Sequence, residues 1–147
     1  MSDVSRQKTP YDQAGEDDDE SEYDPFAAIV MDDPTMQKCW LVLGKLFYHY
    51  DSTDFLEPVT PDCEFYDDYI RMIRDPMDIS TIRERCEVNY YINRAHGDSF
   101  YAKELFKQDV MLMFTNCRKF NERGSDIVKS SERLEDEFRS ECILHDI

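Results

Sequence analysis

A stripe of apolar residues three or four positions apart runs through the second half of the chain, which is the spacing of one face of an α-helix. The stripe consists of Phe106, Val110, Met113, Phe114 and Cys117. We expect this helix to begin at a Ser99 cap and to end near Phe120.

A second amphipathic helix is predicted to begin at Asp33 and Pro34. Aspartate caps the first N–H groups of a helix, and proline is accommodated at the first helical position. The helix is predicted to end near Asp51-Ser52. Its apolar face consists of Met36, Cys39, Trp40, Leu43, Leu46, Phe47 and Tyr50.

The segment after this helix has no helical period. Residues 53–68 contain Pro58, Pro61 and six acidic residues, which indicates a long irregular connection of a kind that often carries function. Apolar positions at 69–73 then predict a short helical turn, which Pro76 stops.

The remaining pattern predicts two more helices. Asp78 can cap a helix with Ile79, Ile82 and Cys86 facing inward, and residues 89–98, which include Gly97, indicate a loop. Ser125 or Asp126 is predicted to cap the last helix, whose inward face consists of Ile127, Leu134 and Phe138. Four main helices without a convincing strand predict an all-α fold, an antiparallel four-helix bundle.

The N-terminal residues 1–28 differ in composition from the rest. Residues 1–33 contain 11 acidic and two basic residues, centred on the run from Glu16 to Glu22. We expect residues 1–28 to be a disordered acidic tail and residues 29–147 to form the bundle. The run lacks the ligand alternation and the glycine of a calcium-binding loop. Deletion of residues 1–28 is therefore expected to leave thermal stability nearly unchanged.

The net charge of the chain restricts the classes of partner that it can bind. The 33 Asp and Glu against 17 Lys and Arg give a net charge of −16, which disfavours nucleic acid and anionic membranes because both bind through Lys and Arg. We expect basic partners, no direct nucleic-acid binding and no membrane binding. Without a membrane-spanning run or a signal-peptide core, the sequence predicts a soluble, intracellular protein.

Neither the cysteines nor the histidines have the spacing of a metal site. The five cysteines are widely spaced without a Cys-x-x-Cys pair, and the three histidines are equally dispersed, so no metal, cofactor or disulfide framework is expected. Pairing of Cys117 with His49 or His145 as nucleophile and base is not enforced by anything in the sequence. We therefore expect a protein that is not an enzyme.

One polar residue stands out at the end of the long helix. Asn121 follows Phe120 and precedes a short glycine-containing turn, after which Ile127 opens the next helix. A primary amide among apolar side chains suits a neutral, amide-bearing ligand. From spacing alone, Asn121 is more readily explained as a helix C-terminal residue, because asparagine tolerates the left-handed conformation there.

Two blocks of the chain resemble the bromodomain family, a left-handed four-helix module that binds acetylated lysine and has a long loop between its first two helices. One block runs from Phe55-Leu-Glu-Pro-Val59 through Tyr69 to Pro76-Met-Asp78, and the other is Asn116-Cys-Arg-Lys-Phe-Asn121. The resemblance covers roughly residues 34–142 and implies the same fold for this chain.

The resemblance also implies an acetyl-lysine site. Asn121 would donate to the acetyl oxygen, Tyr69 would reach it through a water, and Ile127 would pack against the lysine stem. Tyr69 can also be explained as an ordinary core tyrosine, and Ile127 and Val59 as plain core residues. Phe120 is more readily a packing residue of the wall than a ligand contact. The implied site residues are Asn121, Tyr69, Val59, Ile127, Phe55, Phe120 and Tyr66.

Three features depart from the family pattern. Where one branch has Trp-Pro-Phe, this chain has Thr53-Asp54-Phe55, and Glu64 and Tyr66 occupy two aliphatic positions of the loop. The loop around residues 89–99 is also longer than is usual in the family. Five acidic residues of the first loop are either an ordinary solvated face or a rim that attracts Lys and Arg beside an acetylated site. They are Glu57, Asp62, Glu64, Asp67 and Asp68.

The resemblance implies a nuclear protein that binds acetylated histone tails, or other acetylated proteins, and recruits further chromatin and transcription factors. The alternative is a helical scaffold or adaptor subunit that keeps the fold while its acetyl-lysine pocket is weak or unused. The altered Thr53-Asp54 positions and Glu64 motivate this alternative.

Overall fold

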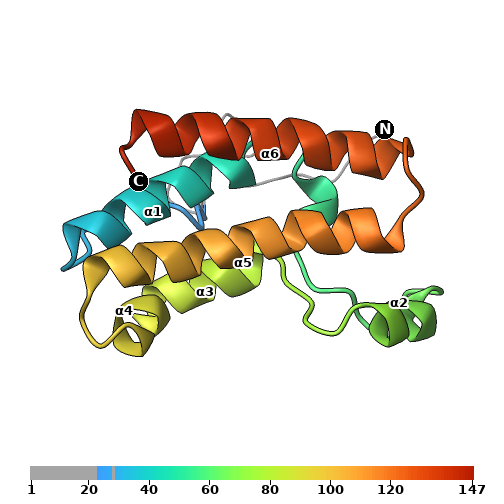
Figure 1. The fold of residues 1–147 in the computed structure, drawn as a ribbon, viewed down its shortest axis with the longest axis horizontal. Helices are drawn as coiled ribbons and strands as arrows, with labels where there is room; N and C mark the ends of the chain where they lie inside the picture. Colours follow the sequence, from blue (N-terminus) through green and yellow to red (C-terminus); the bar gives the residue numbers. More distant parts are fainter. Residues whose placement is uncertain (1–22, 28) are drawn as a thin grey trace.

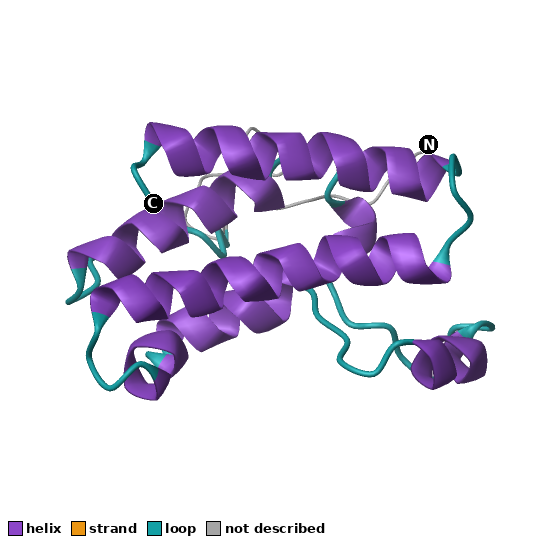
Figure 2. Cartoon of the chain, viewed as in Figure 1, coloured by secondary structure: helices purple, strands orange, loops and turns teal. Residues whose placement is uncertain are grey.

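Four long helices form the body of the protein. The computed structural model describes residues 23–27 and 29–147, and its four main helices lie side by side as an elongated bundle, with the short helix of the long connection set apart from them (Figure 1). Every regular element in these residues is helical (Figure 2), which confirms the predicted all-α four-helix bundle. The elements are α1 (Pro34–Phe47), η2 (Thr53–Phe55), α2 (Tyr66–Met72), α3 (Ile79–Glu87), α4 (Tyr90–Arg94), α5 (Ser99–Phe120) and α6 (Asp126–Leu144).

Helix α1 begins as predicted but ends earlier. The Asp33 side chain accepts from the N–H of Thr35 at 3.1 Å, which satisfies one of the free donors at the helix start. The helix stops at Phe47 and not near residue 51. The Ser52 hydroxyl donates to the free carbonyl of Phe47 at 2.9 Å, so a side chain replaces the next helical hydrogen bond and the chain turns.

Helix α5 spans the predicted residues, but its predicted cap was wrong. Asp98 is the N-cap, and its carboxylate accepts from the N–H groups of Phe100 and Tyr101. Ser99 is the first helical residue, and its hydroxyl donates to the carboxylate of Asp33 at 2.7 Å. The serine hydroxyl therefore joins the starts of two helices that are 66 residues apart.

Residues 89–98 are not simply a loop, because they contain the short helix α4. Asn89 precedes it with φ of 60°, and Gly97 follows it with φ of 85°, a left-handed conformation that favours glycine. Tyr91 is 1% exposed, and its hydroxyl donates to Asp109 of α5 at 2.5 Å. This burial holds a five-residue helix that is too short to be stable alone.

The core lies between α1, α3, α5 and α6. All five residues of the predicted stripe on α5 are buried, and Leu134 and Phe138 of α6 face them, whereas Tyr50 lies beyond α1 and is 80% exposed. The largest fully buried side chains are Trp40, Tyr91, Phe106, Phe114, Leu43, Leu46, Ile73, Ile79, Ile82, Met113, Leu134 and Val42. Within the described residues, no helix is long and apolar enough to cross a membrane.

Residues just before α1 contact the bundle. The ring of Phe26 lies 4.8 Å from that of Trp40 and 5.0 Å from that of Phe47, measured between centroids. Phe26 is thus part of the packed structure, although the sequence prediction placed it in the acidic tail. The acidic run at residues 16–22 lies outside the described residues.

Candidate functional site

A pocket of about 350 Å³ opens between the long connection that follows α1 and the junction of α5 with α6. The connection supplies most of the lining, and the last turns of α5, the residue Asn121 and the second residue of α6, Ile127, supply the rest. Its lining consists of Asp54, Phe55, Glu57, Pro58, Val59, Phe65, Tyr69, Pro76, Met77, Asp78, Met113, Cys117, Phe120, Asn121 and Ile127. Most of these side chains are apolar.

The amide of Asn121 is held by the end of α5. Its backbone N–H and its side-chain Nδ2 both donate to the carbonyl of Cys117, at 3.0 and 2.9 Å. With φ of −103° and ψ of 156°, Asn121 is extended, so a left-handed conformation does not explain why asparagine stands here. A primary amide has two N–H donors and an acceptor oxygen, and Nδ2 contacts both the Cys117 carbonyl and, at 3.7 Å, the Cys117 sulfur, a weak acceptor. The amide oxygen and the N–H beside the sulfur can therefore turn to a ligand.

Three aromatic residues form one wall of the pocket. The ring centroids of Tyr69 and Phe120 lie 5.0 Å apart at 74°, and Phe65 lies 5.6 Å from Phe120. Burial raises the pKa of the Tyr69 phenol, with smaller contributions from Cys117 and Asp78. Tyr69 is therefore a neutral hydroxyl at pH 7 that can donate a hydrogen bond.

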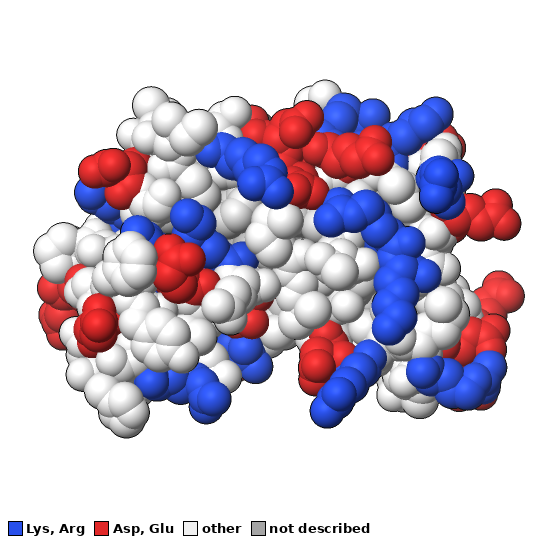
Figure 3. Space-filling view, in the orientation of Figure 1, with Lys and Arg blue, Asp and Glu red and all other residues white. Residues whose placement is uncertain are grey.

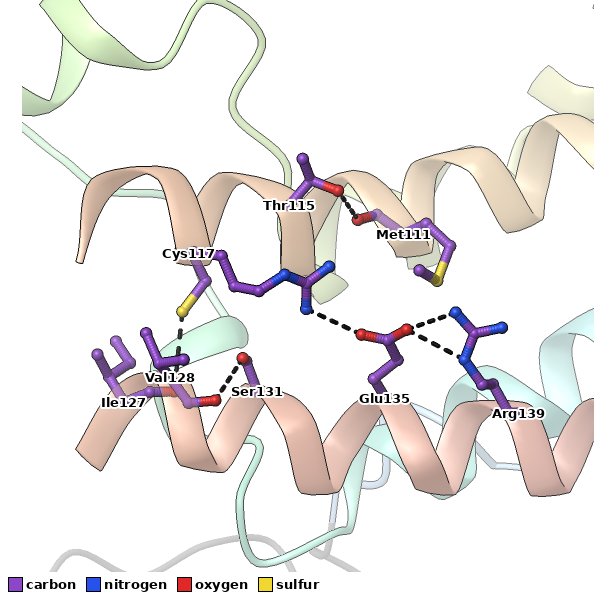
Figure 4. A network of polar contacts seen from close by, with 9 residues as sticks. Met111, Thr115, Cys117, Ile127, Val128, Ser131, Glu135 and Arg139 are labelled. Atoms are coloured by element: carbon purple, nitrogen blue, oxygen red, sulfur yellow. Dashed lines mark hydrogen bonds and ion pairs between the residues drawn. The ribbon is translucent and has the colours of Figure 1, made fainter. Parts of the chain in front are cut away.

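Phe55, Val59 and Ile127 add aliphatic and aromatic surface to the lining. Phe55 is buried against Phe114, with ring centroids 6.1 Å apart, whereas Val59 and Ile127 are half-buried. The Cys117 thiol is 3.7 Å from the Ile127 carbonyl, which links the end of α5 to the start of α6 (Figure 4). Burial raises the pKa of the Cys117 thiol, so it is also uncharged at pH 7.

Hydrogen bonds from the bundle hold the loop side of the pocket in place. The buried carboxylate of Asp78 caps α3 by accepting from the Thr81 N–H at 2.9 Å. The Ser80 N–H donates to the Leu56 carbonyl at 3.0 Å, which joins the start of α3 to the loop. Asn116 of α5 donates to the Asp75 carbonyl at 2.9 Å, beside Pro76. These bonds explain how a long connection can form a defined wall.

The structure brings together six of the seven residues that the sequence assigned to the site. Asn121, Tyr69, Val59, Ile127, Phe55 and Phe120 line the pocket. Tyr66 lies in the first turn of α2 and is not among the lining residues.

Except for Glu57, which was considered as part of an acidic rim, sequence reasoning did not assign a site role to the other lining residues. Pro76, Met77 and Asp78 belong to a block that carries the family resemblance, so that block could have identified them. Phe65 and Met113 have no such signal, because only the packing of the loop against α5 brings them to the pocket.

The described residues offer no metal centre and no paired catalytic cysteine. No group of three or more His, Cys, Asp or Glu side chains could hold a metal ion in this part of the chain. Within it, the Cys117 thiol contacts the Ile127 carbonyl and the Asn121 amide, and His145 lies beside Glu141 at 3.4 Å. The thiol is protonated and has no histidine base among these contacts.

Comparison with known proteins agrees with this architecture. The bromodomain family model matches residues 39–133. The bromodomain adjacent to zinc finger domain protein 2A of Xenopus laevis is 36% identical over 97 residues, which are 66% of this chain and 5% of that protein. The bromodomain adjacent to zinc finger domain protein 2B of Homo sapiens is 34% identical over 103 residues, which are 70% of this chain and 4% of that protein.

The match is confined to one domain, since this chain spans about a twentieth of the length of these relatives. The matched segment nevertheless contains the whole pocket, from Asp54 to Ile127. The family match, the four-helix architecture and the pocket agree in placing the same segment in one known class of binding module. This chain belongs to the bromodomain family.

Proposed function

We propose that this protein binds acetylated lysine in histone tails, with the acetyl group inside the pocket that ends at Asn121. An N–H of the Asn121 amide donates to the acetyl oxygen, and the Tyr69 hydroxyl orders a bridging water. Phe55, Val59 and Ile127 contact the aliphatic stem. The observation that carries the proposal is a single primary amide at the end of an apolar pocket whose Tyr69 and Cys117 are neutral.

The same environment provides selectivity against unmodified lysine. Moving an ammonium group from water into such a pocket costs on the order of several kcal/mol in lost solvation. A neutral acetamide does not have this cost. The lining contains carboxylates only from Asp54, Glu57 and Asp78, and the Asp78 carboxylate is occupied by its helix cap. By this proposal the protein is nuclear and recruits other chromatin and transcription proteins to acetylated sites.

Binding of histone-tail peptides tests the proposal directly. Wild-type protein and Asn121→Ala are titrated with acetylated and unacetylated peptides, and Asn93→Ala, an exposed asparagine of α4, serves as the matched control. We expect acetyl-dependent binding that Asn121→Ala weakens at least about tenfold and that Asn93→Ala leaves unchanged. Thermal unfolding of each variant establishes that it is folded.

Two results would contradict the proposal. Retention of acetyl-peptide binding in folded Asn121→Ala would show that the pocket assignment is wrong. Absence of binding to every acetylated peptide by folded wild type would favour the scaffold alternative, which the replaced positions Thr53 and Asp54 motivate.

A further inference from the structure

A second cavity lies between α5 and α6, away from the pocket that ends at Asn121. We call it the α5–α6 groove; its volume is about 330 Å³. About four helical turns of α5, or roughly 20 Å, separate Lys107 of this groove from Asn121. The groove includes Ile147, at the end of the bundle opposite α2 (Figure 1). Its lining consists of Lys107, Met111, Phe138, Arg139, Cys142, Ile143 and Ile147.

The floor of the groove is apolar and belongs to the core. Phe138 and Cys142 are 2% and 6% exposed, and Met111 packs against the same core. Ile147 closes one end of the groove, because its N–H donates to the Cys142 carbonyl at 2.9 Å and Asp146, with φ of 60°, turns the chain back. The packing of the bundle therefore forms the groove in advance of any ligand.

One lip of the groove leaves apolar surface in contact with water. Ile143 lines the groove and is 81% exposed. Its neighbour Leu144 is 73% exposed but lies outside the lining. Concave sites with an apolar lining and a few polar groups are where proteins bind ligands. Because the apolar surface continues over the lip, the groove suits a segment of another protein better than an enclosed small molecule.

Both charged residues of the lining are basic. Within the residues that the structure describes, Lys107 takes part in no hydrogen bond or ion pair. Arg139 and Arg118 share the single carboxylate of Glu135, at 3.0 and 2.9 Å (Figure 4), so this group of three retains a positive charge. On the face shown in Figure 3, basic side chains lie over both helices beside an uncharged area.

Two acidic side chains near Cys142 have partners of their own. Glu104 lies 3.9 Å from a lysine, and Glu141 lies 3.4 Å from a histidine. Burial raises the pKa of the Cys142 thiol at the floor, and the charges with the largest effect on this pKa, Lys107 and Arg139, lower it. The groove is thus a locally positive site on a chain whose net charge is −16.

We propose that the α5–α6 groove binds an acidic amphipathic helix of a partner protein. Its apolar side chains pack on Phe138 and Cys142, and its Asp or Glu side chains lie beside Lys107 and Arg139. A groove between helices accepts such a helix through apolar anchors three, four and seven positions apart. The acidic run at residues 16–22 of this chain contains no apolar side chain, so it does not match the floor. The inference does not depend on acetyl-lysine binding.

Selection from a peptide library tests the proposal. The probe is a displayed library of random peptides of roughly 15 residues, about four helical turns, selected against the full chain. The charge variant is K107Q/R139Q, and K119Q/R123Q removes the same charge from exposed positions outside both linings. The apolar variant is I143S, and L144S, which changes the exposed neighbour outside the groove, is its control. Thermal unfolding of each variant establishes that it is folded.

We expect selection to enrich peptides with apolar residues at helical spacing flanked by Asp or Glu. K107Q/R139Q should weaken their binding about threefold to tenfold, with a smaller effect at higher salt. I143S should weaken it about tenfold, because this side chain becomes buried in the complex. Both controls and Asn121→Ala should bind as wild type does. Failure to enrich such peptides, or undiminished binding to either K107Q/R139Q or I143S, would overturn the inference and leave the proposed function untouched.

Discussion

Asn116 provides a test of how the bundle holds the loop side of the pocket. Its buried side chain donates from Nδ2 to the Asp75 carbonyl at 2.9 Å, across 41 residues of sequence. Asn116→Ala removes this donor and leaves the carbonyl without its partner. A buried acceptor left unpaired costs about 1–3 kcal/mol. Because Asp75 itself is exposed, water can replace part of the bond. We therefore expect Asn116→Ala to lower the free energy of unfolding by about 1–2 kcal/mol.

The neighbouring residue supplies the control for this measurement. Thr115 is exposed on the same helix, and its hydroxyl donates only to the Met111 carbonyl one turn earlier, at 3.0 Å (Figure 4). Asparagine and threonine have similar helix propensities, so Thr115→Ala gains about the same propensity as Asn116→Ala. The difference between the two variants therefore cancels the gain in helix propensity and leaves the loss of the buried Asn116 amide with its bond to Asp75.

Urea unfolding followed by circular dichroism measures this difference. Asn116→Ala should unfold with a free energy about 1–2 kcal/mol below that of Thr115→Ala and with an unchanged denaturant slope. In a domain of this size, that corresponds to a midpoint lower by roughly 3–8 °C. If the two variants agreed within about 0.5 kcal/mol, the bond would contribute nothing to stability, and the loop wall would be held by other contacts.

Two further predictions concern stability. Arg133 holds the pKa of Asp51 below its ordinary value of 3.8. Asp51→Asn should therefore lower the free energy of unfolding at pH 7. In urea unfolding, its difference in free energy from wild type should vanish as the pH falls below 3.8, and a pH-independent difference would refute this prediction. Deletion of residues 1–28 also removes Phe26, so it should lower the thermal midpoint, contrary to the expectation from the sequence; Phe26→Ala should cost about 1–2 kcal/mol, and a neutral Phe26→Ala would contradict its packing role.

Features set by local spacing were predictable from the sequence. The buried face of α5 follows from a period of 3.6 residues, and all five of its predicted positions are buried. Asp33 and Asp78 cap α1 and α3 as predicted, because a cap involves only residues two or three positions away. The family motif then led from Asn121 and Tyr69 to six of the fifteen residues that line the pocket.

The tertiary structure decided what depends on distant partners. Helix α4 exists because Tyr91 is buried against α5. The Ser99 hydroxyl donates to Asp33 and does not cap its own helix. Asn116 and Asn121 lie in one short motif, yet one binds the loop through Asp75 and the other faces the pocket. Spacing along a chain determines which face of a helix is apolar, but which polar group meets which is settled only when remote segments pack together.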